Sequence, residues 1–278
     1  MQGRARSPQL SRANADRHEL YTLAVQSPDA EIDFVTRIFR KLRGRPLRRL
    51  REDFCGTGAT ACEFVSRHAD NHAVGLDLDT RTLAWGREHR VGKLAGDARD
   101  RVNLLRSDVR TPPRGARNVD AVLAMNFSYW ILSDRGSLLG YFKTVRDSLA
   151  PDGLFFLDTY GGYEASKEMQ ERRRVSAGRG RWFKYVWDQA WFDPLSNHMK
   201  CHIHFEFERG PAWNKAFTYR WRLWSIPETR ELLLEAGFKR VTIYWEGDDN
   251  KGGGNGVFTP RKVGEQCASF IAYIVAER

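Results

Sequence analysis

The sequence predicts an α/β fold in which a mostly parallel sheet is interrupted by an inserted antiparallel β segment. Short apolar runs alternate with helical spacing over residues 46–159, an aromatic-rich stretch follows at residues 164–226, and helix–strand order resumes at residue 227. Strands that alternate with helices are typical of a parallel sheet that is covered on both faces. A chain of 278 residues with 41% hydrophobic residues is long enough for one such domain with an insertion.

We expect seven strands in the main sheet, with helices between most of them. The expected strands cover residues 46–52, 73–78, 102–107, 119–125, 153–159, 241–245 and 268–275. Two helices are expected within residues 17–43, the second opened by Pro28, and further helices at residues 59–67, 80–88, 136–149 and 227–236. The glycine-rich residues 251–256 are expected to form a flexible hairpin loop rather than a phosphate-binding loop.

The insertion and the N-terminal tail set the expected domain boundaries. Residues 1–15 are polar and are expected to be disordered. Residues 16–163 and 227–278 are expected to form one domain, and residues 164–226 an antiparallel β lid. Within the lid, β-rich runs at residues 182–192, 199–207 and 212–224 predict three strands joined by turns.

Composition limits the classes of function. The net charge of +10 is concentrated in arginine clusters at residues 37–51 and 172–184, which favour either anionic partners such as nucleic acid or an ordinary solvated surface. The four cysteines are scattered and indicate neither a zinc site nor a disulfide framework, so we expect no metal and a cytoplasmic location. No apolar run approaches the roughly 18 residues that a membrane span needs.

A glycine-rich turn carries the most information about function. Gly56 and Gly58 flank Thr57 just before a helical run, and Asp77 ends the next apolar run. Glycines allow the backbone to approach a ligand, the helix N-terminus offers free N–H groups, and a later carboxylate can accept both hydroxyls of a ribose. The turn alone fits a dinucleotide, S-adenosylmethionine (SAM), or a plain strand-to-helix connection with no ligand.

The order of several further segments resembles the class I SAM-dependent methyltransferases. The matching segments are residues 52–58, 75–79, 107–109, 120–130, 149–154 and 235–238, and the resemblance covers roughly residues 20–278. It implies a Rossmann-like sheet whose last strand is antiparallel, with SAM as the cofactor. A dehydrogenase does not explain the closing helix–strand–loop–strand unit, which is characteristic of this family.

The resemblance assigns a role to each matching residue. Gly56 and Gly58 would approach the methionine part of SAM, Asp77 would bind the ribose hydroxyls, and Asp108 would accept from the adenine amino group. The backbone of Val109 would donate to the adenine. The residues predicted to bind the cofactor are Tyr21, Arg51, Glu52, Asp53, Phe54, Cys55, Gly56, Thr57, Gly58, Asp77, Leu78, Asp108, Val109, Asn126 and Phe127.

The sequence departs from the family pattern at one point. The usual motif is an acid followed by three glycines at alternate positions, but here Phe54 replaces the first glycine, and both Glu52 and Asp53 are candidates for the acid that organises the loop. Arg51 either binds the carboxylate of the cofactor or balances the two acids. Tyr21 either folds over the cofactor or packs on a helix face.

The acceptor is expected to be a small molecule, because the insertion is rich in aromatic residues and similar insertions occur in small-molecule methyltransferases. An aromatic lid excludes water and suits a cationic sulfonium or an amine substrate, with hydroxyl and carboxylate acceptors as alternatives. The residues predicted to bind substrate are Tyr129, Trp130, Asp158, Tyr160 and Glu164, because ligands bind at the carboxyl ends of strands in open α/β sheets.

Two other classes of function remain open at the level of sequence. The basic clusters suit an RNA or protein methyltransferase, and the cofactor motif alone suits a non-catalytic SAM- or nucleotide-binding module. His202 and His204 alternate along one lid strand and either face the site or lie on a solvated face. The sequence identifies neither a catalytic base nor an oligomeric state.

Overall fold

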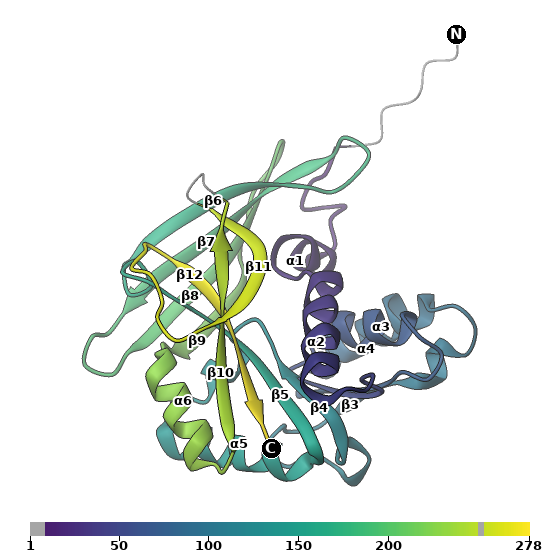
Figure 1. Ribbon diagram of the computed structural model, residues 1–278. Helices are drawn as coiled ribbons and strands as arrows, with labels where there is room; N and C mark the ends of the chain where they lie inside the picture. The colour runs from purple at the N-terminus through teal and green to yellow at the C-terminus, as the bar shows by residue number, and fades with distance from the viewer. Residues whose placement is uncertain (1–8, 250–252) are drawn as a thin grey trace. The chain divides into compact units, whose positions relative to one another are not determined.

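An eight-stranded sheet forms the centre of the larger of two units in the computed structural model, which describes residues 9–249 and 253–278 (Figure 1). The larger unit consists of Pro28–Ala165 and Trp224–Arg278, and the smaller unit consists of Ser166–Leu223 with the described residues up to Ser27. The chain therefore leaves the larger unit after the fifth strand and returns to it before the last helix.

The helices and strands follow the predicted alternation. The helices are α1 (Arg17–Val25), α2 (Pro28–Arg43), α3 (Ala59–Ser66), α4 (Thr80–His89), α5 (Arg135–Ser148) and α6 (Ile226–Glu235). The strands of the larger unit are β1 (Arg49–Asp53), β2 (His72–Asp77), β3 (Val102–Arg106), β4 (Val119–Ala124), β5 (Leu149–Gly161), β10 (Arg240–Asp248), β11 (Gly254–Arg261) and β12 (Phe270–Glu277). Short 3₁₀ turns lie at η1 (Val91–Lys93), η2 (Gly96–Arg101), η3 (Arg114–Ala116) and η4 (Ser128–Ile131).

The strand order of the larger sheet is β11-β10-β12-β5-β4-β1-β2-β3. The strands from β1 to β5 pair in parallel, and β12 is antiparallel to both β5 and β10. The predicted α/β class and the antiparallel last strand are thereby confirmed. The expected seven strands are one too few, because β11 pairs with β10 at the edge.

The additional strand β11 lies where the sequence predicts a loop. Residues 251 and 252 of that loop are outside the described part of the chain, but residues from Gly254 onward are extended, and Thr259 pairs with Trp245 of β10. Glycines obscure the strand pattern in this stretch. The ring of Phe258 packs 4.5 Å from that of Tyr273, which gives the strand an apolar contact that the sequence pattern does not reveal.

Helices cover both faces of the larger sheet, and β5 shows how the two faces are separated. Consecutive side chains of a strand point to opposite faces. Phe156 packs against Phe34 of α2, and Phe155 packs against Phe142 of α5. The apolar residues of α2 and α3 join one core cluster with Leu83 of α4, whereas α5 and α6 lie on the other face.

Polar residues at the helix starts explain where several helices begin. Asp79 caps α4 by accepting from the backbone N–H groups of Arg81 and Thr82. Ser225 and Glu228 form a reciprocal capping box at the start of α6, which also carries a proline in its first turn. The cap of α4 marks the end of the loop after β2. The capping box of α6 marks the point where the chain returns to the larger unit.

The smaller unit is an antiparallel sheet of β6 (Met169–Ser176), β7 (Trp182–Phe192), β8 (His198–Phe207) and β9 (Trp213–Arg222), in that order. The expectation of three strands is wrong, because β6 adds a fourth. Its run of glutamate and arginines hides the strand pattern, and of its residues only Val175 is buried. Charged residues are common on edge strands, where they oppose aggregation.

Helix α1 packs on one face of the smaller sheet. Leu20 and Ala24 belong to the same apolar cluster as Ile203 and Phe205. Leu10 is buried in this cluster as well, so part of the segment expected to be disordered is packed; residues 1–8 lie outside the described part. Most of the aromatic residues of the insertion also belong to this cluster or pack against it, so they build the core of the smaller unit.

Candidate functional site

The carboxyl ends of β4, β1, β2 and β3 lie side by side at one edge of the larger sheet, because these strands are parallel neighbours. The chain runs outward from β1 to β3 and then returns to the other side of β1 as β4. Such a reversal of strand order opens a crevice above the sheet, where α/β proteins bind ligands. The loops that follow these strands contain most of the residues predicted to bind the cofactor.

The loop after β1 has a left-handed backbone at three alternate positions. The φ angles are 57° at Phe54, 54° at Gly56 and 70° at Gly58. Phe54 thus adopts a conformation that favours glycine, at a cost of roughly 1–2 kcal/mol for a residue with a side chain. Its ring meets the edge of Tyr141 at 5.7 Å, which offsets part of that strain.

The two glycines of the loop differ in what surrounds them. A Cβ atom on Gly58 would lie 2.6 Å from Leu104, so the glycine allows the loop to pack closely on β3. A Cβ atom on Gly56 would meet only Thr82, at 3.9 Å. The backbone at Gly56 is therefore open toward the crevice, next to the start of α3 at Ala59.

Glu52 points toward the helices α2 and α3. Its Oε2 accepts from the backbone N–H of Ala61 at 2.9 Å, and the hydroxyl of Thr60 donates to Oε2 of Glu31 at 3.0 Å. Burial raises the pKa of Glu52 to about 8, and the neighbouring negative charges of Glu31 and Asp77 add to the effect. The carboxyl thus supports the helix that follows the loop.

Asp53 points to the opposite face of the strand, toward α5. Its carboxylate is bound by Arg51, with Nε–Oδ1 and Nη2–Oδ2 distances of 2.9 and 3.0 Å, and by the hydroxyl of Tyr141 at 2.8 Å. The side chains of Arg51 and Asp53 are both fully buried. Arg51 also donates to the carbonyl of Ala116 at 3.1 Å, so its guanidinium is held inside the protein.

The carboxylate of Asp77 binds two backbone groups. Its Oδ2 accepts from the N–H of Gly56 at 2.9 Å, and its Oδ1 accepts from the N–H of Asp79 at 2.8 Å. Asp77 therefore joins the loop after β1 to the loop after β2. Leu78, the next residue, is 60% exposed, which leaves an apolar surface beside the carboxylate.

Asp108, in the loop after β3, is bound by Arg110. The guanidinium bridges both carboxylate oxygens, with an Nη2–Oδ2 distance of 2.7 Å, and the backbone N–H of Arg110 donates to Oδ1 at 2.8 Å. These hydrogen bonds lower the pKa of Asp108. The side chain remains partly exposed, and the neighbouring Val109 is buried.

The loop after β4 is held by Asp158 of β5. Asn126 and Phe127 are both left-handed, with φ angles of 57° and 56°, and their N–H groups donate to the two oxygens of Asp158 at 2.9 Å each. Burial raises the pKa of Asp158 to about 7, although these two hydrogen bonds oppose the shift. Consecutive strained residues fixed by a buried carboxylate are typical of functional loops.

Three aromatic rings gather where β4 and β5 end. The ring of Tyr160 lies 4.9 Å from Phe127 and 4.8 Å from Trp130. Tyr160 and Phe127 are partly exposed, whereas Trp130 and Tyr129 are fully buried. Tyr129 faces Phe142 of α5, and burial raises the pKa of its hydroxyl.

The structure gives the remaining candidate residues contacts within their own units. Glu164 is partly exposed, and its backbone N–H donates to the carbonyl of Ala268 at 3.0 Å. Tyr21 belongs to the smaller unit and packs on Phe217 at 4.9 Å. His204 pairs with Asp188 at 3.1 Å in the same unit.

Two residues of this region were not predicted from the sequence. Glu31 lies beneath the loop through its bond to Thr60, and Tyr141 binds Asp53. Glu31 has a signal in the sequence, because it shares the apolar helical stripe of Val35 and Ile38, where a carboxylate is unusual. Nothing in the local pattern distinguishes Tyr141 from other core aromatics.

Two findings in the described residues concern metal-binding clusters and membrane-spanning helices. Residues 9–249 and 253–278 contain no cluster of three or more histidine, cysteine or acidic side chains arranged to hold a metal ion. Within the same ranges, every helix is too short or too polar to cross a bilayer.

Comparisons with known proteins agree with this geometry. The family model described as a methyltransferase domain matches residues 53–157, which run from the end of β1 into β5. A comparison with curated protein sequences finds no match.

Solved structures share the fold over nearly the whole chain. An amino pentose methyltransferase from Micromonospora echinaspora, solved with SAM bound, is 20% identical, with a TM-score of 0.68 and coverage of 94% of this chain and 95% of that chain. The DesVI protein of Streptomyces venezuelae is 19% identical, with a TM-score of 0.69 and coverage of 95% and 98%. A sugar N-methyltransferase from a Streptoalloteichus species is 18% identical, with a TM-score of 0.64 and coverage of 100% and 98%.

The sequence match runs from the end of β1 into β5, and the structural matches establish the fold. Both agree with the reversal of strand order between β1 and β4 and with the loop geometry around it. Residues 53–157 therefore match a methyltransferase domain, and the chain has the fold of SAM-dependent methyltransferases.

Proposed function

We propose that the protein transfers a methyl group from SAM to an amine of a small molecule, with an amino sugar as the first acceptor to test. One observation carries the cofactor assignment: the carboxylate of Asp77, at the end of β2, binds the N–H of Gly56 in the left-handed loop after β1. When bound, SAM supplies a methyl group on a positively charged sulfur.

The charges around the loop fit such a cofactor. Glu31, Glu52 and Asp158 are buried, and Glu31 raises the pKa of each of the other two. A cationic ligand stabilises the ionised form of such carboxyls, which suits the sulfonium and ammonium groups of SAM. The open backbone at Gly56 leaves room for a ligand to approach.

We assign different roles to the two acids of the motif. Glu52 supports the loop through its bond to the first turn of α3. Asp53 and Arg51 neutralise each other inside the protein, which favours the alternative in which Arg51 balances the acids. Asp77 would hold the ribose, and Asp108 the adenine, with Arg110 keeping that carboxylate ionised.

The loop after β4 would face the reacting methyl group. Asp158 acts here as a positioning residue, because both of its oxygens are used on the backbone of Asn126 and Phe127. Phe127 and Tyr160 would form an aromatic wall that excludes water from the transfer. Holding the acceptor nitrogen close to the methyl group supplies most of the acceleration in such displacements.

The preference for an amine rests on the aromatic composition of the β insertion and on the similar structures. The printed descriptions of three of them are an amino pentose methyltransferase, a sugar N-methyltransferase and a glycopeptide N-methyltransferase. Hydroxyl and carboxylate acceptors are the alternatives. These acceptor classes differ in the proton that must leave, since an amine can arrive neutral whereas a hydroxyl needs a base.

The test is methyl transfer from methyl-labelled SAM to a panel of amino sugars, each matched with the hydroxyl sugar of the same ring. We expect labelled product only where the amine is present, and reduced transfer by Asp77→Ala at SAM concentrations that half-saturate the wild type. Equal labelling of amine and hydroxyl sugars, or transfer to neither, would contradict the proposed acceptor class.

A further inference from the structure

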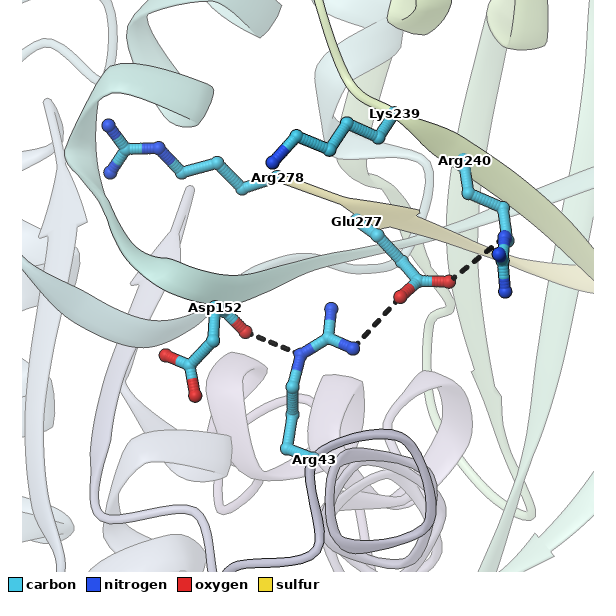
Figure 2. Close-up of a pocket in the computed structure, with 6 residues that line it drawn as sticks. All are labelled: Arg43, Asp152, Lys239, Arg240, Glu277 and Arg278. Atoms are coloured by element: carbon cyan, nitrogen blue, oxygen red, sulfur yellow. Dashed lines mark hydrogen bonds and ion pairs between the residues drawn. The ribbon is translucent and has the colours of Figure 1, made fainter.

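A small cavity lies at the edge of the larger sheet opposite the cofactor loops (Figure 2). It encloses about 280 Å³, and its lining comes from the end of α2, the start of β5, the start of β10 and the end of β12: Arg43, Asp152, Lys239, Arg240, Glu277 and Arg278. The paired part of β5 separates it from the loop after β4 by roughly 20 Å of extended chain. A ligand here cannot touch the methyl-transfer site.

The two acids of the lining are already engaged by arginines. Glu277 binds Arg43 at 2.8 Å and lies 3.7 Å from Arg240, as the dashed lines of Figure 2 show. The carboxylate of Asp152 is held by Arg45, with an Nη2–Oδ1 distance of 2.9 Å. These bonds fix the walls of the cavity before any ligand arrives.

Two cations of the lining have no acid of their own. Lys239 forms no ion pair with any residue in the described ranges 9–249 and 253–278. The guanidinium of Arg278 donates to a backbone carbonyl, that of Leu149. The lining thus holds four cations and two acids, and Arg45 from outside the lining offsets one of those acids.

We propose that this cavity binds a small phosphate-type oxyanion through Lys239 and Arg278. Lysine and arginine are the residues that bind such oxyanions, and their hydrogen bonds to charged oxygens are stronger than neutral ones. The volume of about 280 Å³ leaves room for a phosphate or for the phosphate end of a monoester.

The occupant would join segments that are distant in the sequence. Lys239 precedes β10, and Arg278 follows β12. An anion between them ties the last two paired strands of the sheet together at this edge, so it stabilises the folded protein by mass action. This inference is independent of the methyl acceptor, because none of its residues lies in the cofactor crevice.

The test measures thermal unfolding and calorimetric binding with inorganic phosphate and, separately, with a hexose 6-phosphate, against chloride at equal ionic strength. Wild type is expected to gain stability from at least one phosphate ligand beyond the effect of chloride. In Lys239→Gln/Arg278→Gln, affinity should fall by about tenfold or more, since charge-assisted hydrogen bonds are lost. A response to both ligands, or to inorganic phosphate alone, identifies the free phosphate group as sufficient; a response only to the ester shows that the sugar contributes.

The matched control is Lys143→Gln/Arg49→Gln, which makes the same change of charge at exposed positions outside the cavity. It should bind phosphate like the wild type. Equal weakening in both double variants would show a general charge effect and overturn the proposal, as would a wild type that responds to phosphate no more than to chloride. If the cavity double variant does not fold, Lys239→Gln alone serves, because no side-chain contact of Lys239 is lost.

Discussion

Asp77 binds two backbone N–H groups from two different loops, and this double contact makes it the most sensitive single position of the crevice. The sequence predicts Asp77 as a ribose ligand, and the structure adds its second task of holding Gly56. A side chain that shapes the loop and also meets the ligand affects binding in both ways.

We expect Asp77→Ala to weaken the binding of S-adenosylhomocysteine by roughly 1–3 kcal/mol, because a charged acceptor is lost from a partly buried site. Isothermal titration calorimetry measures the effect. Asp79→Ala is the control, since Asp79 caps α4 with its side chain and would leave the ribose acceptor in place. Equal affinities for wild type and Asp77→Ala would remove Asp77 from the binding site.

Two buried carboxyl groups are expected to make the affinity for SAM depend on pH. Burial raises the pKa of Glu52 to about 8 and that of Asp158 to about 7, so both hold protons near neutral pH. A cationic ligand favours the ionised carboxyls, and its binding therefore releases protons. The affinity for SAM should rise as the pH increases from 6 to 8 and level off above the higher pKa.

Calorimetry in buffers of different ionisation enthalpy counts the protons released on binding. Glu52→Gln removes one of the two titrating groups, so its affinity should change less with pH than that of the wild type. A wild-type affinity that stays constant over this range, with no proton release, would show that these carboxyls do not sense the cofactor.

At the scale of elements, β1 combines two acids with opposite surroundings. Glu52 faces α3, and Asp53 faces α5, because neighbouring side chains of a strand alternate. The arginine content of this strand is unusual for a central parallel strand. The structure resolves the conflict, since Arg51 is buried against Asp53 whereas Arg49 is exposed.

We expect Arg51→Ala to lower the free energy of unfolding by about 3–5 kcal/mol, because Asp53 would remain as a buried charge without its partner. Arg49→Ala, on the same strand, should change it by no more than about 0.5 kcal/mol. Urea denaturation of both variants makes the comparison. Similar effects of the two substitutions would contradict the assignment of Arg51 to the interior.

The sequence predicts some of the strands and misses others. Periodicity predicts the parallel strands and their order along the chain, because apolar runs of a buried sheet are distinct. It misses β6 and β11, whose charged or glycine-rich residues carry little apolar pattern. Edge strands need few buried residues, so their sequences lack the signal that central strands have.

The same contrast holds within the candidate site. Gly56, Gly58 and Asp77 are recognisable from spacing, because a left-handed backbone favours glycine and a carboxylate at the end of the next strand can bind the loop. Asp158 was predicted to meet substrate, but both of its oxygens bind the backbone after β4. Contacts of this kind depend on how two strands are paired, which a single sequence does not encode locally.

At the scale of the whole molecule, internal pairing engages part of the basic cluster at residues 37–51. Arg43 binds Glu277, Arg45 binds Asp120 and Asp152, and Arg51 binds Asp53. A nucleic-acid surface needs cations that are free to meet phosphates. This pairing weakens the case for an RNA methyltransferase.

We therefore expect no saturable binding of single-stranded or duplex RNA up to about 10 µM protein at physiological salt, within the range where non-specific binders begin to associate. Fluorescence anisotropy at several salt concentrations measures it. Tight binding that weakens steeply with added salt would restore the nucleic-acid alternative and direct the search for an acceptor toward RNA.

The loops between β1 and β4 are the proposed binding site for SAM. Calorimetric titration of the folded protein with S-adenosylhomocysteine is the first measurement to make, because this product needs no acceptor. We expect one site per chain with micromolar affinity, weakened in Asp77→Ala. An absence of binding to a chain shown by circular dichroism to be folded would contradict this proposal.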